Sequence, residues 1–180
     1  MIFTNILEDE YKKTIQSCAD TVKNFEIENS NTAHASYLIA TLFGKAELEM
    51  RIFTGSLFDN VYGNAALKEA AIKFLSKSKA ILKIAYQDAV SFDVIKEGNF
   101  LKDILTNLKV KGQVTIYNAS TFCKNLENHF IVKDNTAFRY ELDKTKRTAR
   151  ANFGDLDTAK NLVEIFDLIT NSSEKVYPVN

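Results

Sequence analysis

Short apolar segments of strand character alternate with longer helical segments through the middle of the sequence. The strand-like segments span 50–54, 81–86 and 114–117, and the segments between them, 65–77 and 99–109, have apolar residues at helical spacing. Strands that are separated by helices pair in parallel through right-handed crossovers. The sequence therefore predicts an α/β fold with a mixed, mostly parallel sheet flanked by helices.

This alternation ends in the last third of the chain. Residues 129–133 and 137–142 both have strand character, and Asp134-Asn135-Thr136 between them has the composition of a hairpin turn. An antiparallel hairpin is therefore expected there. A final helical segment at 157–170 closes the fold.

The organisation of the chain is that of one domain. Two helical patterns precede the first strand, so we assign residues 1–47 to an N-terminal helical extension and 48–170 to the α/β core. The polar residues 171–180 are expected to form a flexible tail. No proline-, glycine- or serine-rich linker divides the sequence, so residues 1–180 are predicted to form a single domain.

Composition limits the ligands and the location that we expect. The 23 basic and 23 acidic side chains give no overall positive field, so a nucleic-acid ligand would need a local patch such as the basic run Lys144–Arg150. Cys18 and Cys123 lie outside any Cys/His cluster, and no glycine-rich nucleotide motif occurs, so we expect neither a metal nor a cofactor. The acidic N-terminus and the lack of a run of ~20 apolar residues predict a cytoplasmic protein without a membrane span.

A cluster of polar side chains is expected on the hairpin. Strand alternation places His129 and Lys133 on one face of the first strand, and Arg139 and Glu141 on one face of the second. If these faces coincide, His129, Arg139 and Glu141 lie together. The Arg139 guanidinium then forks either Glu141 or a phosphate group, which leaves an internal ion pair and a ligand pocket as alternatives.

The turn Thr54-Gly55-Ser56 follows the first strand, at the edge where open parallel sheets hold their ligands. Its backbone amides are placed to bind an anion, and a simple tight turn is the alternative interpretation.

The order of the elements, with the segment 127–155, resembles one half of a phospholipase D superfamily enzyme. The signature of that superfamily is H-x-K-x-x-x-x-D, with a G-S-x-N element further on. In the registration that we favour, Asp134 takes the aspartate place, His129 the lysine place and Glu127 the histidine place. Ala151-Asn152-Phe153 resembles the later element.

A second registration places His129 on the histidine of the signature. Ile131 then takes the lysine place and Thr136 the aspartate place, so this registration preserves less of the motif. The two registrations differ in one consequence, because only the second leaves a histidine where the superfamily has its nucleophile.

The resemblance implies a catalytically inactive binding or scaffold domain, because Glu127 is repelled by phosphate and is a poor substitute for the histidine nucleophile. A residual phosphate or other anion pocket is expected from six residues: His129, Lys133, Asp134, Arg139, Glu141 and Asn152.

Two alternatives follow from the same resemblance. One is a metal-independent phosphodiesterase or nuclease with His129 as nucleophile, active as a homodimer, since single-motif members of the superfamily combine two chains. The other is a protein-interaction component of a bacterial defence or regulatory system. The expected partners are accordingly a second copy of the chain, a nucleic acid or other phosphodiester, or another protein.

Overall fold

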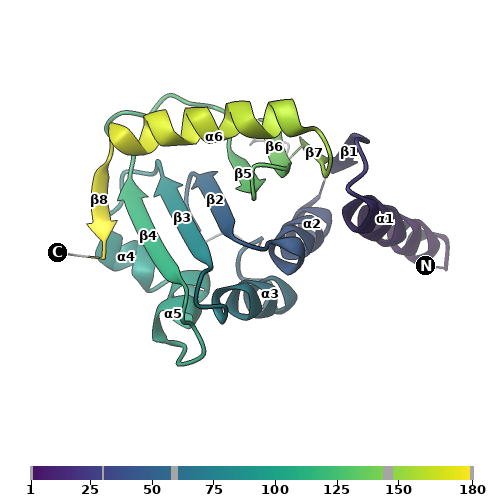
Figure 1. The fold of residues 1–180 in the computed structure, drawn as a ribbon, viewed down its shortest axis with the longest axis horizontal. Coiled ribbons are helices and arrows are strands. Elements are labelled where there is room, and N and C mark those ends of the chain that lie inside the picture. Colours follow the sequence, from purple (N-terminus) through teal and green to yellow (C-terminus); the bar gives the residue numbers. More distant parts are fainter. Residues whose placement is uncertain (1, 30, 58–60, 144–147, 179–180) are drawn as a thin grey trace.

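The computed structural model describes residues 2–29, 31–57, 61–143 and 148–178. These residues form an eight-stranded sheet with helices on both faces, in the strand order β1-β7-β6-β5-β2-β3-β4-β8 (Figure 1). The strands are β1 (Ile27–Asn29), β2 (Glu49–Thr54), β3 (Ile81–Tyr86), β4 (Gln113–Asn118), β5 (Phe130–Lys133), β6 (Ala137–Asp143), β7 (Thr148–Asn152) and β8 (Glu174–Tyr177). The helices are α1 (Ile2–Thr21), α2 (Thr32–Lys45), α3 (Ala65–Leu75), α4 (Phe92–Lys96), α5 (Asn99–Thr106) and α6 (Leu156–Asn171).

The sheet is parallel only at its centre. Strands β2, β3 and β4 pair in parallel, with Ile52, Ile84 and Ile116 side by side. The other neighbouring strands pair antiparallel. The α/β class with flanking helices is confirmed, but the prediction that the sheet is mostly parallel is wrong. The parallel pairs are those joined by the helical connections through α3 and α5, whereas β5, β6 and β7 follow one another through hairpin-length connections.

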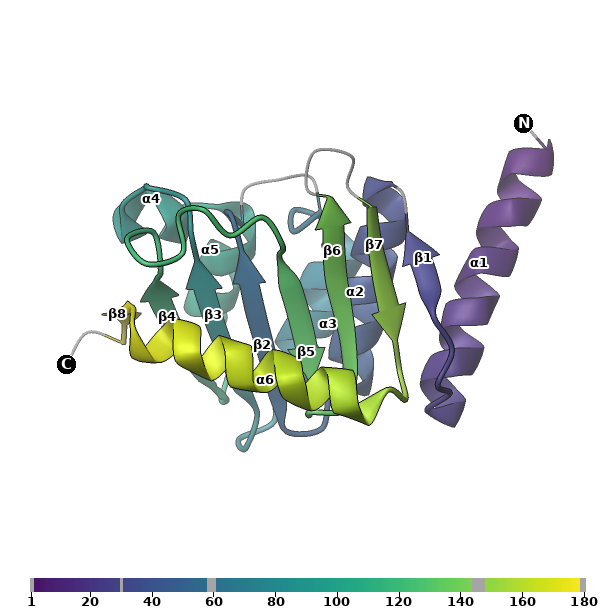
Figure 2. The ribbon, with the colours of Figure 1, turned by 90° about the horizontal axis from the view of Figure 1, so that it is seen from above.

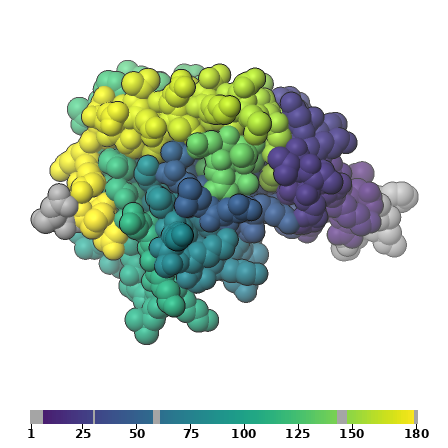
Figure 3. All heavy atoms as spheres, viewed as in Figure 1, coloured from purple at the N-terminus to yellow at the C-terminus, as the bar shows by residue number. Residues whose placement is uncertain are grey.

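The helices form a layer on each face of the sheet. Helices α2, α3 and α5 lie on one face, and α6 runs across the strands on the other (Figures 1 and 2). Successive residues of β2 point to opposite faces. Ile52 therefore lies in the same buried cluster as Leu38 and Leu42 of α2, whereas Phe53 lies in a second cluster with Phe166 of α6. In the space-filling view, α6 extends along the top of the molecule, from beside β8 toward the N-terminal segment (Figure 3).

The two ends of the chain are more closely joined to the core than we predicted. Helix α2 packs against α3, β5 and β6, and β1 pairs with β7, so the predicted N-terminal extension contributes to the core. Residues 174–177, predicted as part of a flexible tail, form β8 and pair with β4. Strands β1 and β8 are both short and lack alternating apolar residues, so the sequence pattern does not predict them. No helix in the described part of the chain is long and apolar enough to cross a membrane.

Gly154 lies in the turn between β7 and α6, against the backbone of residues 22–24. A Cβ atom there would lie 2.7 Å from the backbone nitrogen of Asn24 and would also clash with the Val22 carbonyl oxygen. Backbone atoms have no rotamer with which to move aside. Gly154→Ala is therefore expected to lower the free energy of unfolding by about 2 kcal/mol, measured by urea denaturation.

Gly44 provides the matched control for this substitution. It lies in the last turn of α2, and apart from its chain neighbours and the backbone of its own helix no described atom lies within 4 Å of the position that its Cβ would take. Gly44→Ala is expected to raise the free energy of unfolding by about 0.5 kcal/mol, because alanine loses less backbone entropy in a helix. Equal stability of the two variants would contradict the close approach at Gly154.

Candidate functional site

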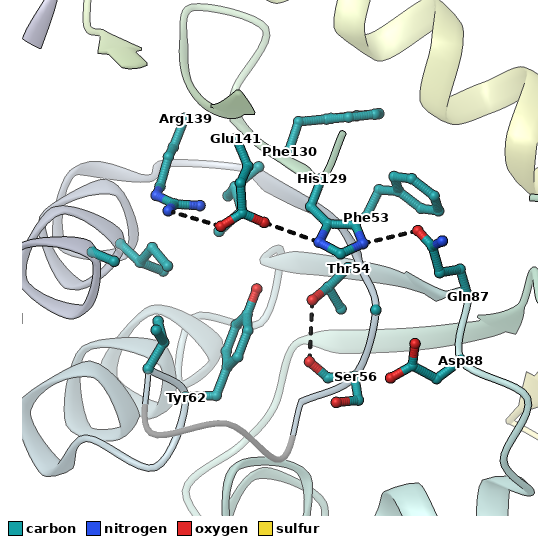
Figure 4. Close-up of a pocket in the computed structure, with 15 residues that line it drawn as sticks. Phe53, Thr54, Ser56, Tyr62, Gln87, Asp88, His129, Phe130, Arg139 and Glu141 are labelled. Atoms are coloured by element: carbon teal, nitrogen blue, oxygen red, sulfur yellow. Dashed lines mark hydrogen bonds and ion pairs between the residues drawn. The ribbon is translucent and has the colours of Figure 1, made fainter. Parts of the chain in front are cut away.

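A cavity of about 310 Å³ opens at the carboxyl ends of β2 and β3. This is the edge at which open sheets with parallel strands hold their ligands. The turn Thr54-Gly55-Ser56 borders the cavity after β2, and Gln87 and Asp88 border it after β3. Side chains from the start of β5, from β6 and from α2 complete the wall (Figure 4).

His129 lies in this wall, immediately before β5. The hairpin pairs Ile131 with Arg139, which brings His129 opposite Glu141. Its Nδ1 atom lies 3.0 Å from Oε2 of Glu141, and its Nε2 atom lies 2.8 Å from Oε1 of Gln87. The ring also packs edge-on against Phe53, with 5.8 Å between centroids. The two contacts of the ring nitrogens and the packing against Phe53 together fix the orientation of the imidazole ring.

Arg139 and Glu141 continue the chain of polar contacts. Arg139 is only 6% exposed and donates from Nε to Oδ1 of Asn29 at 3.1 Å and from its NH2 group to Glu141 at 3.4 Å. Burial raises the pKa of Glu141, but the His129 hydrogen bond and the Arg139 charge outweigh burial and bring that pKa below its ordinary value. Glu141 is therefore an ionised carboxylate, and the contacts link strand β1 to the cavity.

The opposite rim of the cavity carries further polar groups. A Cβ on Gly55 would lie 3.1 Å from Oδ1 of Asp88 and 3.2 Å from Cε1 of His129, so this glycine lets the two side chains approach each other. The Thr54 hydroxyl donates to the Ser56 carbonyl oxygen at 3.1 Å, which closes the turn after β2. Tyr62 points toward the cavity from the other side (Figure 4). The cavity thus presents charges of both signs to a ligand.

Three of the six predicted ligand-binding residues meet here, and three do not. His129, Arg139 and Glu141 line the cavity, as the strand alternation predicted. Lys133 and Asp134 lie at the far end of β5, next to Met50, and their charged groups are 3.4 Å apart. The four residues of β5 span about 13 Å, too far for both ends to reach one small ligand.

Asp134 and Asn152 make structural contacts instead. Asp134 accepts hydrogen bonds from the backbone N–H groups of residues 47–49. Asn152 donates to Asn24 and accepts from the backbone of Gly154 and Asp155, at the turn into α6. The expectation that these residues share the cavity is therefore corrected.

The position of His129 also changes the choice of registration. Glu127 is exposed on the loop before β5 and does not line the cavity, whereas His129 does. The geometry therefore favours the registration with His129 in the histidine place over the one with Glu127 in that place. Ile131 then occupies the lysine place, where it is 2% exposed and lines the cavity.

Sequence reasoning missed Gln87, Asp88 and Tyr62 as cavity residues. The first two directly follow a predicted strand at its carboxyl end, which was the available signal. Lys144–Arg147 of the basic run lie outside the described residues, and Arg150 pairs with Glu26 at 3.5 Å. Among the described residues, no group of three His, Cys, Asp or Glu side chains is placed to hold a metal ion.

Neither a protein-family model nor a curated protein matches the sequence. Solved structures do match the fold. Nuc from Salmonella typhimurium, a phospholipase D family member, superposes with a TM-score of 0.61 at 12% identity over 85% of this chain and 98% of Nuc. The fold is phospholipase D-like. NucT from Helicobacter pylori gives a TM-score of 0.55 at 10% identity, over 85% of this chain and 98% of NucT.

The phospholipase D-like fold of this chain is also similar to TrmBL2, an archaeal chromatin protein with a novel mode of DNA binding. That match has a TM-score of 0.60 at 12% identity and covers 96% of this chain but 63% of TrmBL2. At these identities the matches establish the phospholipase D-like fold and confirm the resemblance read from the hairpin.

Proposed function

We propose that the chain is a non-catalytic phospholipase D-like binding domain whose cavity holds a small ligand with a phosphate or another anionic group. The observation that carries the proposal is the wall of the cavity, where Arg139 and His129 lie beside a buried isoleucine. Arg139 and His129 supply cationic and hydrogen-bonding groups for an anion, but Ile131 takes the place of the lysine in the superfamily signature.

The replacement at Ile131 argues against turnover. Phosphoryl transfer depends on positive groups that stabilise the charge developing on the transferred phosphorus oxygens. The superfamily signature has a lysine two residues after its histidine, and an apolar isoleucine side chain supplies no charge at that place. Binding has no such requirement, because Arg139 carries five N–H donors in a planar fork that suits phosphate.

The size of the cavity and the structural matches support a phosphate-bearing ligand. A volume of about 310 Å³ lies at the lower end of the range for small-molecule sites. The same fold occurs in a phospholipase D family member and in a DNA-binding chromatin protein. Inorganic phosphate and dimethyl phosphate are therefore the first probes to test.

A second candidate is a metal-independent phosphodiesterase or nuclease, completed by a second copy of the chain, with His129 as nucleophile. It is favoured by the position of His129 in the cavity of a fold that Nuc shares. The two candidates differ in an observable way, because only this one predicts hydrolysis that depends on His129.

Asp88 supplies the test of anion binding. Its carboxylate borders the cavity and opposes an anion, so Asp88→Asn is expected to tighten phosphate binding about fivefold. Affinity is measured from chemical-shift changes at Gln87 and His129 during titration with phosphate. Asp93→Asn is the matched control, because its side chain is 81% exposed on α4, outside the cavity, and should change the affinity by less than about twofold.

The outcomes of this titration are distinct. Shifts confined to residues of the cavity, with tighter binding in Asp88→Asn alone, support the proposal. Resonances that do not respond to either probe, or equal tightening in both variants, would show that the cavity has no anion site.

A further inference from the structure

Asp88 is a charged residue of the cavity wall that opposes a simple anion and has no part in binding one. We propose that the ligand of the cavity is a small soluble phosphate ester that also carries an amine, with its phosphate group at Arg139 and its ammonium group at Asp88. This rests on the proposed function and names the class of ligand for the same cavity.

The charges of the cavity wall do not suit a purely anionic ligand. Among the described lining residues, Arg139 is the one permanent cation, whereas Glu141 and Asp88 both carry carboxyl groups. A positive charge on His129 would only balance these two groups. Because like charges repel, a ligand with negative charge alone is opposed by part of this wall. A ligand that also carries a cation complements both signs.

The two carboxylates differ in how their charge is compensated. Glu141 lies 3.0 Å from Nδ1 of His129 and 3.4 Å from the NH2 group of Arg139, so its partners belong to the protein. The Asp88 side chain makes no ion pair or hydrogen bond with a described residue. Its backbone is held in place, since the N–H group donates to the Gly55 carbonyl oxygen at 3.0 Å. Asp88 is therefore a positioned carboxylate that is left for a cation of the ligand.

Arg139 and Asp88 lie at different ends of the cavity wall (Figure 4). Contacts within the protein use the Nε and NH2 donors of Arg139, and its NH1 group, with no such contact to a described residue, is left for an anion. Oδ1 of Asp88 and Cε1 of His129 lie 3.1 Å and 3.2 Å from the position of a Cβ on Gly55. His129 and Glu141 thus separate the two charges, so a short ligand can reach both.

The surroundings of the cavity favour a soluble ligand over the headgroup of a lipid. None of the large apolar side chains that are exposed in the described part of the chain lines the cavity. A ligand in a membrane would require such side chains at the mouth, because association with a bilayer increases with the apolar area that is buried in it. The volume of about 310 Å³ also suits a small molecule.

Two ligands that differ in one group test the proposal. Phosphoethanolamine and propyl phosphate have nearly the same shape, but the first ends in an ammonium group and the second in a methyl group. The full-length wild type is expected to bind phosphoethanolamine about fivefold more tightly at low ionic strength, as for one favourable exposed ion pair. Isothermal titration calorimetry measures both affinities, and added salt should reduce the preference.

Asp88→Asn should abolish the preference for the amine. This substitution should tighten the binding of propyl phosphate, as it does that of inorganic phosphate, but not the binding of phosphoethanolamine, so that the two affinities come within about twofold. Comparing two ligands on one protein cancels any general effect of the substitution on the phosphate site. Asp93→Asn, on α4 outside the cavity, should keep the fivefold preference.

Equal binding of the two esters by the wild type would overturn the proposal, and this outcome does not depend on whether a variant folds. A preference that persists in Asp88→Asn would overturn it too, because the amine would then contact another group. Cosedimentation with phosphatidylethanolamine vesicles, without binding of the soluble ester, would contradict a soluble ligand. If inorganic phosphate and both esters all fail to bind, the proposed function fails. If all three bind equally, only the class of ligand is wrong.

Discussion

Replacing Arg139 with methionine is expected to lower the free energy of unfolding by about 3–5 kcal/mol. Methionine fills much of the same space but has no donor, so Asn29 and Glu141 both lose a partner. The larger part of the loss comes from Glu141, an ionised and largely buried carboxylate that would retain only His129. Urea denaturation with a shared m-value measures the change.

Arg150 is the control for this experiment. It lies on the neighbouring strand β7 with 42% of its side chain exposed, and its ion pair with Glu26 spans 3.5 Å. Arg150→Met should cost less than about 1 kcal/mol, since exposed ion pairs contribute little. Adding Glu141→Gln to Arg139→Met should recover part of the stability, because a neutral amide needs no counter-charge. Equal stability of the two arginine variants would mean that the buried contacts of Arg139 contribute nothing.

Replacing Asp134 with alanine is expected to cost about 3 kcal/mol, although this residue lies far from the cavity. Its carboxylate accepts from the backbone nitrogens of Glu47, Leu48 and Glu49 at 2.7, 2.8 and 2.7 Å, which joins the hairpin turn to the start of β2. Asp134 also has a φ of 47°, a left-handed conformation that aspartate tolerates better than alanine. Asp134→Asn keeps that conformation and one acceptor oxygen, and should lie between the wild type and Asp134→Ala.

The effect at Asp134 should depend on pH in a defined direction. Burial raises the pKa of this carboxyl group. The three backbone hydrogen bonds and the charge of Lys133 together lower it by more, so the pKa lies below its ordinary value. A group whose folded pKa is depressed stabilises the fold above its unfolded value of about 4, and this contribution is lost as the pH falls through the folded value.

The stability difference between the wild type and Asp134→Ala should therefore be full at neutral pH and shrink as the pH falls below the unfolded value of about 4. Denaturation curves across this range measure it. Asp93→Ala, at an exposed i,i+3 pair on α4, should show a small difference at every pH. A difference at Asp134 that does not change with pH would contradict the charged hydrogen bonds.

The parts of the site that could be predicted are those set by local pattern. Period-two alternation and the turn at 134–136 together determine which side chains of the hairpin face each other, so the contact between His129 and Glu141 followed from sequence. The same alternation says nothing about distance along a strand. Lys133 shares a strand face with His129 but lies at the opposite end of β5.

The parts that could not be predicted depend on elements distant in sequence. Gln87 contacts His129 across 42 positions, and Arg139 bonds to Asn29 across 110. Such pairs depend on the order of the strands in the sheet. That order could not be predicted, because it includes the three-residue edge strand β1, which has no recognisable strand pattern in the sequence. The registration preferred from the sequence relied on Asp134, whose carboxylate binds the backbone N–H groups of residues 47–49 and does not line the cavity.

We propose that the cavity binds phosphate groups without hydrolysing their esters. The direct measurement is hydrolysis of a phosphodiester, bis(p-nitrophenyl) phosphate, with chelator present, by the wild type and by His129→Ala. Both proteins are expected to release product no faster than buffer, even at concentrations at which phosphate binding is seen. Chelator-resistant hydrolysis by the wild type that disappears in His129→Ala would contradict this expectation and establish His129 as a nucleophile.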